Sequence, residues 1–341
     1  ILMKRGGILR LKGSESVHLR MIPFLICVFI ALLLIGCNAD NFNPLHELIT
    51  SYNPHHYAKI TADGNNISIK GRFYPHTVSK IQVTPSNIQL SPQVNSDGEV
   101  TSTLTSAGKN GEYGLNFTLE GGATFYYRIY RQNGRWILPD YSISERNRTR
   151  LDSIIEIEKN ITTSYIADDG VRTGDVLDEI KNLSDEICNG ANNDYERALA
   201  ISQWVSSNIY YDLDASDDSV TLTNITLENI VADRRTVCAG FANIYAALCS
   251  AQGIDTINIR CGTIQRNISH SLLEGSSERH EWNAVWIDER WVIVDTTWNT
   301  QNIYSGGEYR DGSTNLKFFD ISIDAISADH RFDLVERRRY Y

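Results

Sequence analysis

Hydrophobic and polar residues alternate along the chain from about residue 60 to residue 141. A period of two residues is typical of strands with one buried face, and residues 126–130 are one of several such runs. Asp-Gly and Asn-Gly pairs separate the runs, and these pairs tolerate the positive φ angles of tight hairpins. We therefore predict a small, antiparallel, β-sandwich-like domain over residues 60–145. It contains no cluster of titratable residues, and His55 and His56 before it are expected in an exposed loop.

The hydrophobic period becomes helical after a charged connector. Two apolar stripes with the spacing of a helix face follow, over residues 176–187 and 198–205. A third stripe begins behind Cys238, and Gly253 with the hydrophobic residue after it is typical of a Schellman-type helix end. Since both periods occur in one chain, the predicted fold class is α+β, with a second domain over residues 160–341.

The N-terminus has the composition of a secretory signal. Residues 1–20 are basic, and a short, uncharged, strongly apolar run follows them. That run ends in Leu-Ile-Gly-Cys at residues 34–37, which resembles the bacterial lipobox and predicts lipid attachment at Cys37. Residues 1–37 would then be a signal peptide with lipobox, and residues 38–59 a tether. We expect a protein outside the cytoplasm, lipid-anchored to the bacterial membrane, with a stop-transfer helix as the alternative.

Composition and charge narrow the possible partners. Hydrophobic residues make up 42% of the chain and aromatic residues 10%, which is enough to build folded cores. The formal net charge is −10, from 42 acidic and 32 basic residues, and beyond the signal segment basic residues cluster only at 337–339. Nucleic acid is therefore not an expected partner.

The chain has six cysteines, of which Cys27 falls in the predicted signal segment. None of the later cysteines form the CxxC pairs of a zinc site, so we expect neither a metal nor another cofactor. A disulfide among Cys188, Cys249 and Cys261 is allowed in an oxidising compartment, but the spacing favours no particular pair.

Cys238 is the candidate nucleophile because it falls in the first turn of a predicted helix. At that position the helix dipole and the first N–H groups favour a thiolate and can bind an oxyanion, and Arg234 and Arg235 add positive charge. Buried free thiols are commonly structural, and this is the expectation for Cys249 in the middle of the helix and for Cys261 in the following strand.

A predicted hairpin downstream of the helix supplies a base and a group to orient it. A two-residue turn at Asp288-Glu289 would place His280 diagonally opposite Asp295 on one face, whereas a three-residue turn would place them on opposite faces. The other histidines of this half, His270 and His330, are expected to be structural or solvated. The order thiol, imidazole, carboxylate is that of a cysteine nucleophile site.

Three segments together resemble the core motifs of the transglutaminase-like superfamily, a papain-related group that includes bacterial secreted members. They are Cys238–Ala242, His280–Asn283 and Asp295–Trp298, and the resemblance covers about residues 193–333. It implies a papain-like core in which the helix that carries the cysteine packs on an antiparallel sheet.

The same resemblance implies that Cys238 is the nucleophile, His280 the acid and base, and Asp295 the orienting group. The sequence departs from the family pattern at two places. Thr236 stands where a glycine is usual, and Asp288-Glu289 stands where an Asp-Gly turn is usual.

The implied reaction is acyl transfer or hydrolysis at amide bonds of peptide or protein substrates, with cell-wall peptide as one possibility. Water would make the protein a cysteine peptidase or amidase, and an amine would make it a transglutaminase-like acyltransferase. Tyr211 is a candidate second oxyanion donor, with a ring packed at a helix end as the alternative. The alternative function is a catalytically silent cell-surface lipoprotein that binds peptide or glycan.

Overall fold

The computed structural model describes residues 47–105, 108–122, 124–138, 142–160, 174–216, 225–263 and 278–337. The predicted signal segment with Cys37 lies outside these residues, and so does His270. All the described elements belong to one compact unit, Asn43–Tyr341. Within the described part of the chain, no helix is both long enough and apolar enough to cross a membrane.

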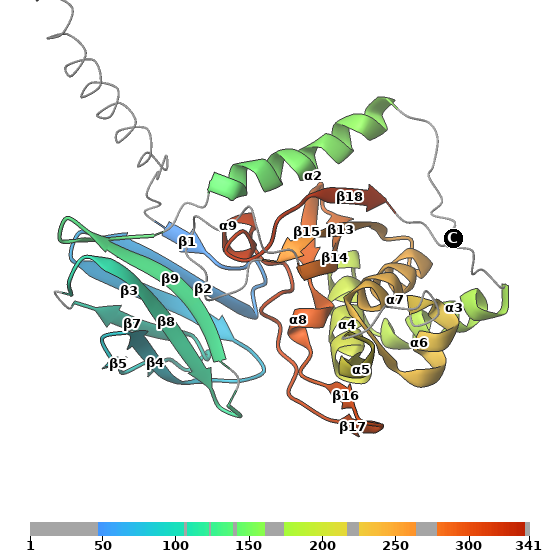
Figure 1. Cartoon of the computed structure of the whole chain (residues 1–341), viewed down its shortest axis with the longest axis horizontal. Helices are drawn as coiled ribbons and strands as arrows, with labels where there is room; N and C mark the ends of the chain where they lie inside the picture. Colours follow the sequence, from blue (N-terminus) through green and yellow to red (C-terminus); the bar gives the residue numbers. More distant parts are fainter. Residues whose placement is uncertain are drawn as a thin grey trace, which may run out of the picture. The chain divides into compact units, whose positions relative to one another are not determined.

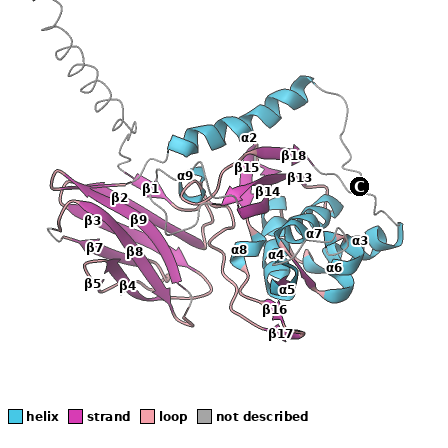
Figure 2. Cartoon of the chain, in the orientation of Figure 1, coloured by secondary structure: helices cyan, strands magenta, loops and turns pink. Residues whose placement is uncertain are grey.

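The first part of the described chain forms two antiparallel sheets (Figures 1 and 2). One sheet has the order β1-β2-β3-β7-β6 and contains β1 (Glu47–Ile49), β2 (His56–Asp63), β3 (Asn66–Phe73), β6 (Gln93–Val94) and β7 (Val100–Leu104). The other has the order β10-β9-β8-β4-β5 and contains β4 (Val78–Thr84), β5 (Ile88–Leu90), β8 (Gly111–Leu119), β9 (Thr124–Gln132) and β10 (Arg135–Ile137).

Alternation along these strands gives each sheet one buried face. In β3, Ile67 and Ile69 are buried while Asn66 and Ser68 are exposed. The buried residues of both sheets form one hydrophobic core, as expected of a β-sandwich. The Asn-Gly pair at residues 133–134 forms a tight hairpin turn as expected, because β9 and β10 pair across it and both residues take positive φ.

The sandwich begins earlier than the sequence predicts. β1 and the first residues of β2 lie within residues 38–59, which were expected to be a tether, and Leu48 of β1 is buried in the core. His56 is also not in an exposed loop. Its ring packs edge-on against Phe73 and Phe125, and burial lowers its pKa to about 4. The β domain therefore begins before residue 60, among residues that were expected to form the tether.

The second part of the described chain combines helices with two further sheets (Figure 2). Its helices are α2 (Ser142–Asn160), α3 (Gly174–Ile187), α4 (Asp194–Asn208), α5 (Leu213–Ser216), α6 (Leu227–Asp233), α7 (Cys238–Ala251), α8 (Thr296–Asn299) and α9 (Ile323–Ile326). An antiparallel sheet of order β15-β14-β13-β18 contains β13 (Asp255–Thr263), β14 (Glu278–Ile287), β15 (Arg290–Val294) and β18 (Leu334–Arg337).

A smaller sheet has the order β12-β11-β16-β17, with β11 parallel to both of its neighbours. Its strands are β11 (Tyr210–Asp212), β12 (Arg235–Thr236), β16 (Ile303–Ser305) and β17 (Glu308–Arg310). β12 ends directly before α7, so this sheet leads the chain into the helix that carries Cys238.

Helix α7 is the central element of this part of the chain. It packs against β13 and β14 on one side and against α3, α4 and α6 on others, and its residues from 240 to 249 are all buried. The helix ends as predicted, because Gly253 takes a φ of 74° and the Ile254 N–H donates back to the Cys249 carbonyl. The prediction of an α+β fold with a cysteine-bearing helix on an antiparallel sheet is confirmed.

Helix α2 packs in a second hydrophobic cluster of this part of the chain, although its charged residues read as a connector in the sequence. Leu151 is 2% exposed and packs in a cluster with Ile257, Trp282 and Phe332. The expected start of this domain at residue 160 therefore leaves out a helix that its core includes. The charged side chains described in α2, at residues 145, 146, 148, 150 and 152, are exposed.

We predict that Leu151→Ala lowers the free energy of unfolding by about 2–4 kcal/mol, because it leaves a cavity in this core. Thr149→Ala, on the exposed face of the same helix, is the matched control and should change stability by less than about 0.5 kcal/mol. Denaturant unfolding of the two variants measures the difference. Equal stability of both would mean that α2 is only a connector.

Candidate active site

Cys238 opens helix α7, and its thiol is half-buried and takes part in no disulfide. Val237, the residue before the helix, places no side-chain hydrogen bond on the first turn, whereas Ser, Thr, Asp or Asn at that position usually would. No side-chain oxygen of residue 237 therefore competes with the sulfur for the positive end of the helix dipole. This is the setting that the sequence predicts for a nucleophile.

Thr236 and Gly240 fit together beside the thiol. A Cβ atom at position 240 would lie 1.8 Å from Thr236 Oγ1, and Thr236 has no exposed surface. Thr236 is one of the two departures from the family pattern. Its side chain is accommodated because residue 240, on the first turn of α7, has none.

The hairpin of β14 and β15 has the predicted register. Ile287 pairs with Arg290, and Asn283 pairs with Val294. The turn is therefore the two-residue turn Asp288-Glu289, and both of its residues take positive φ angles, 51° and 60°. Such angles are unfavourable for residues with a Cβ. The conformation of the turn is therefore imposed by the pairing of β14 with β15 and not by the backbone preferences of Asp288 and Glu289.

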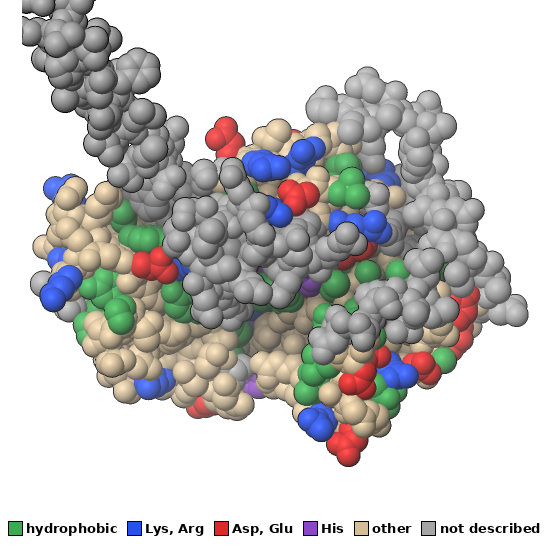
Figure 3. All heavy atoms as spheres, in the orientation of Figure 1, with side chains coloured by type: hydrophobic (Ala, Val, Ile, Leu, Met, Phe, Trp, Pro, Cys, Tyr) green, Lys and Arg blue, Asp and Glu red, His purple; other side chains and the backbone are tan. Residues whose placement is uncertain are grey.

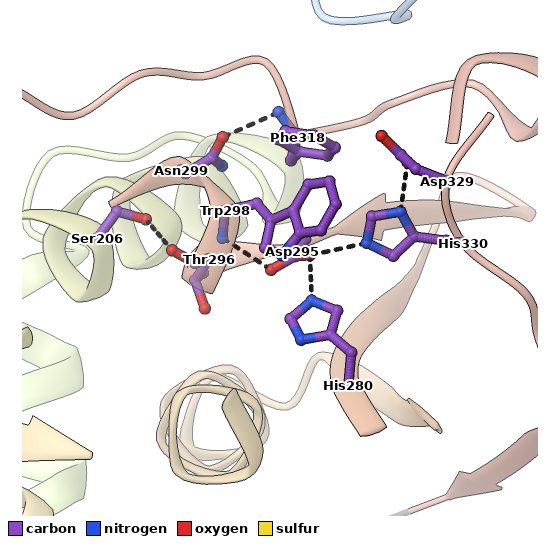
Figure 4. Close-up of polar contacts among 9 residues, drawn as sticks. All are labelled: Ser206, His280, Asp295, Thr296, Trp298, Asn299, Phe318, Asp329 and His330. Carbon is purple, nitrogen blue, oxygen red and sulfur yellow. Dashed lines mark hydrogen bonds and ion pairs between the residues drawn. The ribbon is translucent and has the colours of Figure 1, made fainter. Parts of the chain in front are cut away.

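This register brings His280 and Asp295 into contact. His280 Nε2 lies 2.7 Å from Asp295 Oδ2, and Asp295 has no exposed surface (Figure 4). Asp295 is also the N-cap of α8, where its Oδ1 accepts the Trp298 N–H at 3.0 Å. The Ser206 hydroxyl of α4 donates to the Thr296 carbonyl at 3.1 Å, which fixes the start of α8 against α4.

The contact between His280 and Asp295 shifts the pKa values of both groups. Burial by itself would lower the pKa of His280, but the attraction and hydrogen bond of Asp295 outweigh it, and the Cys238 side chain acts in the same direction. The pKa of His280 is therefore raised above its ordinary 6.5. Burial would raise the pKa of Asp295, but His280 and His330 outweigh it and lower that pKa. Each group thus stabilises the charged form of the other.

Aromatic rings enclose the imidazole of His280. Trp282 stacks on it with ring centroids 5.4 Å apart, and Trp298 lies 5.6 Å away at an angle of 35°. Phe318 packs edge-on against Trp298. These contacts fix the plane of the imidazole. Because Nε2 donates to Asp295, the remaining ring nitrogen, Nδ1, is the one available to the Cys238 thiol.

His330, which was expected to be structural or solvated, is buried and lies against Asp295. Its Nε2 lies 3.2 Å from Asp295 Oδ2 and its Nδ1 lies 2.6 Å from Asp329 Oδ1 (Figure 4). The His330 side chain is fully buried. Nothing in the sequence pointed to this contact, because the residue follows a short helix with no periodic pattern and lies far from the three motifs. His270 lies outside the described residues.

His280, Asp295 and His330 could also hold a cation, since one ligand atom from each lies within 4.8 Å of the other two. In the arrangement described here, however, the Nε2 atoms of both histidines lie at hydrogen-bond distance from the same carboxylate oxygen. Both would have to lose the Nε2 hydrogen before they could ligate a metal. The geometry thus fits an N–H···O network directly.

The remaining candidate residues occupy other positions. Cys188 and Cys249 are buried free thiols, so no disulfide joins them, and burial raises the pKa of Cys249. Cys261 lies in β13 and pairs with His280 across the ladder. The Tyr211 ring stacks on Phe241 of α7 at 6.4 Å, near the helix start, and its part in oxyanion binding stays a prediction.

Together these features define an α+β domain with a helix-borne thiol beside a buried imidazole–carboxylate pair. Residues 181–296 match the family described as the transglutaminase-like superfamily, so the chain carries a transglutaminase-like domain. The match includes Cys238, His280 and Asp295 and ends before His330.

Two curated relatives are kyphoscoliosis peptidases. The chain is 25% identical over 123 residues to the protein of Mus musculus and 28% identical over 129 residues to that of Homo sapiens. Each match covers 36% of this chain but only 18% of the relative.

Solved structures similar to the chain include the periplasmic domain of TgpA from Pseudomonas aeruginosa bound to ethylmercury. It is 12% identical, with a TM-score of 0.30, and the match covers 75% of this chain and 76% of that one. A TGase crystal structure is 16% identical, with a TM-score of 0.29, and the match covers 58% of this chain and 46% of that one. Scores of this size carry no argument about fold or function.

The raised pKa of His280 predicts a pH-dependent contribution to stability. A group whose pKa is higher in the folded state stabilises fully below its unfolded value, here about 6.5, and this contribution is lost as the pH rises through the folded value. We expect the stability advantage of His280 over a His280→Gln variant to fall as the pH rises from about 6.5 to about 10, by at most about 1.4 kcal/mol per pH unit.

Denaturant unfolding in a Cys238→Ala background measures this difference without titration of the thiol. Asp295→Asn in the same background is the control, since it removes the charge that raises the His280 pKa. If the difference in stability between the protein with His280 and the His280→Gln variant stays constant over this range, the proposed ion pair is contradicted.

Proposed function

We propose that the chain is a cysteine-dependent enzyme that transfers or hydrolyses acyl groups at amide bonds of peptide or protein substrates. Cys238 is the nucleophile, His280 the acid and base, and Asp295 the orienting group. The observation that carries the proposal is the 2.7 Å contact of His280 with a fully buried Asp295, beside a half-buried thiol at a helix N-terminus. Proteins commonly reserve such a combination for chemistry.

Each group has a distinct role in the proposed reaction. The Cys238 thiolate adds to the amide carbonyl, and the start of α7 stabilises the negative charge that develops on the oxygen. His280 gives its Nδ1 proton to the departing amine, and a thioester forms. Water or a second amine, deprotonated by His280, then attacks the thioester and releases the thiol. Tyr211, near the same helix end, is the proposed second oxyanion donor.

The family match and the curated relatives support the class of the reaction. The relatives are named as peptidases, and residues 181–296, which match the family model, contain all three proposed catalytic residues. Hydrolysis and amine transfer share the thioester intermediate, so the same triad serves both.

The distribution of surface charge also fits a peptide substrate better than a nucleic acid. On the face drawn in Figure 3, basic and acidic side chains of the described residues are interspersed.

We predict that Cys238→Ala and His280→Ala abolish turnover in a screen of cell-wall peptides and other peptides, run with and without a primary amine. Asp295→Asn should reduce kcat on the order of 10³- to 10⁴-fold, because the imidazole loses its oriented tautomer. Asn is as good an N-cap as Asp, so this variant should keep the start of α8 intact. Cys188→Ala removes a buried thiol far from the chemistry and is the matched control.

Alkylation separates an enzyme from a silent binding protein without knowledge of the substrate. Iodoacetamide at neutral pH should label Cys238 rapidly and leave the buried Cys249 unlabelled in the folded protein. His280→Ala should slow the labelling of Cys238. A Cys238 thiol that reacts no faster than a free cysteine, together with no turnover of any peptide, would favour the silent binding protein.

We also propose that the protein works outside the cytoplasm, anchored to a bacterial membrane by lipid on Cys37. The support is the lipobox-like run at residues 34–37 behind an uncharged apolar segment. From a lipid anchor the enzyme would reach cell-wall peptides and surface proteins.

We predict that Cys37→Ser abolishes both incorporation of a labelled fatty acid and signal processing, because the serine offers no thiol for the diacylglycerol. Mass spectrometry of membrane fractions measures both. Cys27→Ser, within the signal segment, is the control and should mature normally. A Cys37→Ser protein that matures like the parent would exclude the anchor.

A further inference from the structure

His330 is held in place by backbone contacts on both sides. Its own N–H donates to the Ile326 carbonyl at 2.9 Å, and its carbonyl accepts the Asn147 Nδ2–H of α2 at 3.1 Å. The same Asn147 donates to Ser327 Oγ at 2.8 Å and accepts the Phe332 N–H at 2.9 Å. Asn147 is 1% exposed, so these bonds form in the interior. A buried amide in α2 therefore fixes the segment that carries His330.

The ring of His330 lies in a box of aromatic side chains. Trp298 and Trp282 pack against it edge-on, with ring centroids 4.4 Å and 4.7 Å away, and Phe318 lies at 5.9 Å. Full burial leaves its polar atoms no solvent, so the two carboxylates at its nitrogens are the hydrogen-bond partners that its ring has. The ring is thus fixed in position and in orientation.

Asp295 is the point at which His330 meets the proposed triad. Its Oδ2 lies 2.7 Å from His280 Nε2 and 3.2 Å from His330 Nε2, and its Oδ1 accepts the Trp298 N–H. Three donors from three different segments therefore define the plane of this carboxylate. If the His330 donor were absent, the carboxylate could turn about its Cβ–Cγ bond and still keep the other two bonds in weaker geometry.

We propose that His330 is a positioning residue of the active site, which holds Asp295 ionised and in the plane that binds the His280 Nε2–H. This inference rests on the proposed function, since it assigns His330 a role in orienting the proposed base. His330 acts through Asp295, and at 5.4 Å between ring centroids its imidazole does not replace that of His280.

Asp329 completes the arrangement on the far side of His330. Both ring nitrogens of His330 lie at hydrogen-bond distance from a carboxylate oxygen, Nε2 from Asp295 and Nδ1 from Asp329. The partly exposed Asp329 therefore holds the ring from the side opposite Asp295.

Two substitutions separate a hydrogen-bonding role from a packing role. His330→Phe keeps a ring in the aromatic box but removes both donors, whereas His330→Gln keeps an N–H group that can reach Asp295. We expect His330→Phe to lower kcat about 10- to 100-fold with little change in KM, and His330→Gln to stay within about 5-fold of the parent. Phe332→Leu is the packing control, since it alters the contact with Trp282 and removes no donor.

A spectroscopic measurement tests the same role without any substrate. The Nε2 proton of His280 in a bond to a buried carboxylate should give a separate downfield proton resonance in the Cys238→Ala protein. Asp295→Asn should shift or remove this resonance. His330→Phe should shift it towards the Asp295→Asn position, and His330→Gln should leave it near its position in the parent. Adding a chelator should leave it unchanged.

The outcomes distinguish this inference from the proposed function. Absence of turnover in the parent defeats the proposed function, while the resonance still reports whether His330 positions Asp295. If kcat and resonance in His330→Phe match the parent, His330 has no positioning role. If kcat falls in proportion to the melting temperature in all three variants, His330→Phe, His330→Gln and Phe332→Leu, then His330 has only a packing role. A resonance that changes on chelation would show a metal site in place of the proposed network.

Discussion

The carboxylate of Asp295 has no exposed surface, and a bare carboxylate in that position would be strongly unfavourable. It is tolerated because His280, His330 and the Trp298 N–H all reach it. These donors come from β14, from the segment after α9 and from the first turn of α8. The segments therefore have to assemble together, since an incomplete set leaves an ionised group unsatisfied in the interior. The same contacts fix the geometry of the proposed base.

Helix α7 and the hairpin place the thiol beside that pair by separate means. The helix is buried from residue 240 to residue 249, so its start cannot move without disturbing the core. The ladder between β14 and β15 fixes His280 relative to Asp295, even though its turn holds two non-glycine residues at positive φ. The close fit of Thr236 and Gly240 sets how near β12 approaches the first turn of α7.

The sequence predicts these local features because each has a period or a fixed spacing. Alternation and a two-residue turn determined which face His280 and Asp295 share, and the structure confirms that register. Gly253 marked the helix end for an equally local reason, since the left-handed position favours glycine. His330 and Asn147 were missed because their contacts join segments with no common pattern. A polar residue among charged neighbours, such as Asn147 between Arg146 and Arg148, carries no local sign that it will be buried.

The charged groups around Asp295 also bear on the choice between an enzyme and a silent binding domain. Replacing a buried ion pair by well-packed hydrophobic residues is often neutral or stabilising, so stability alone gives little reason for two imidazole–carboxylate pairs in one interior. A binding surface would need polar groups that face its ligand, yet Asp295 and His330 are wholly buried and face each other. On one side the network reaches the half-buried Cys238 thiol through His280, and on the other it ends at the partly exposed Asp329. Its position beside a nucleophile favours catalysis at Cys238 over binding in its vicinity.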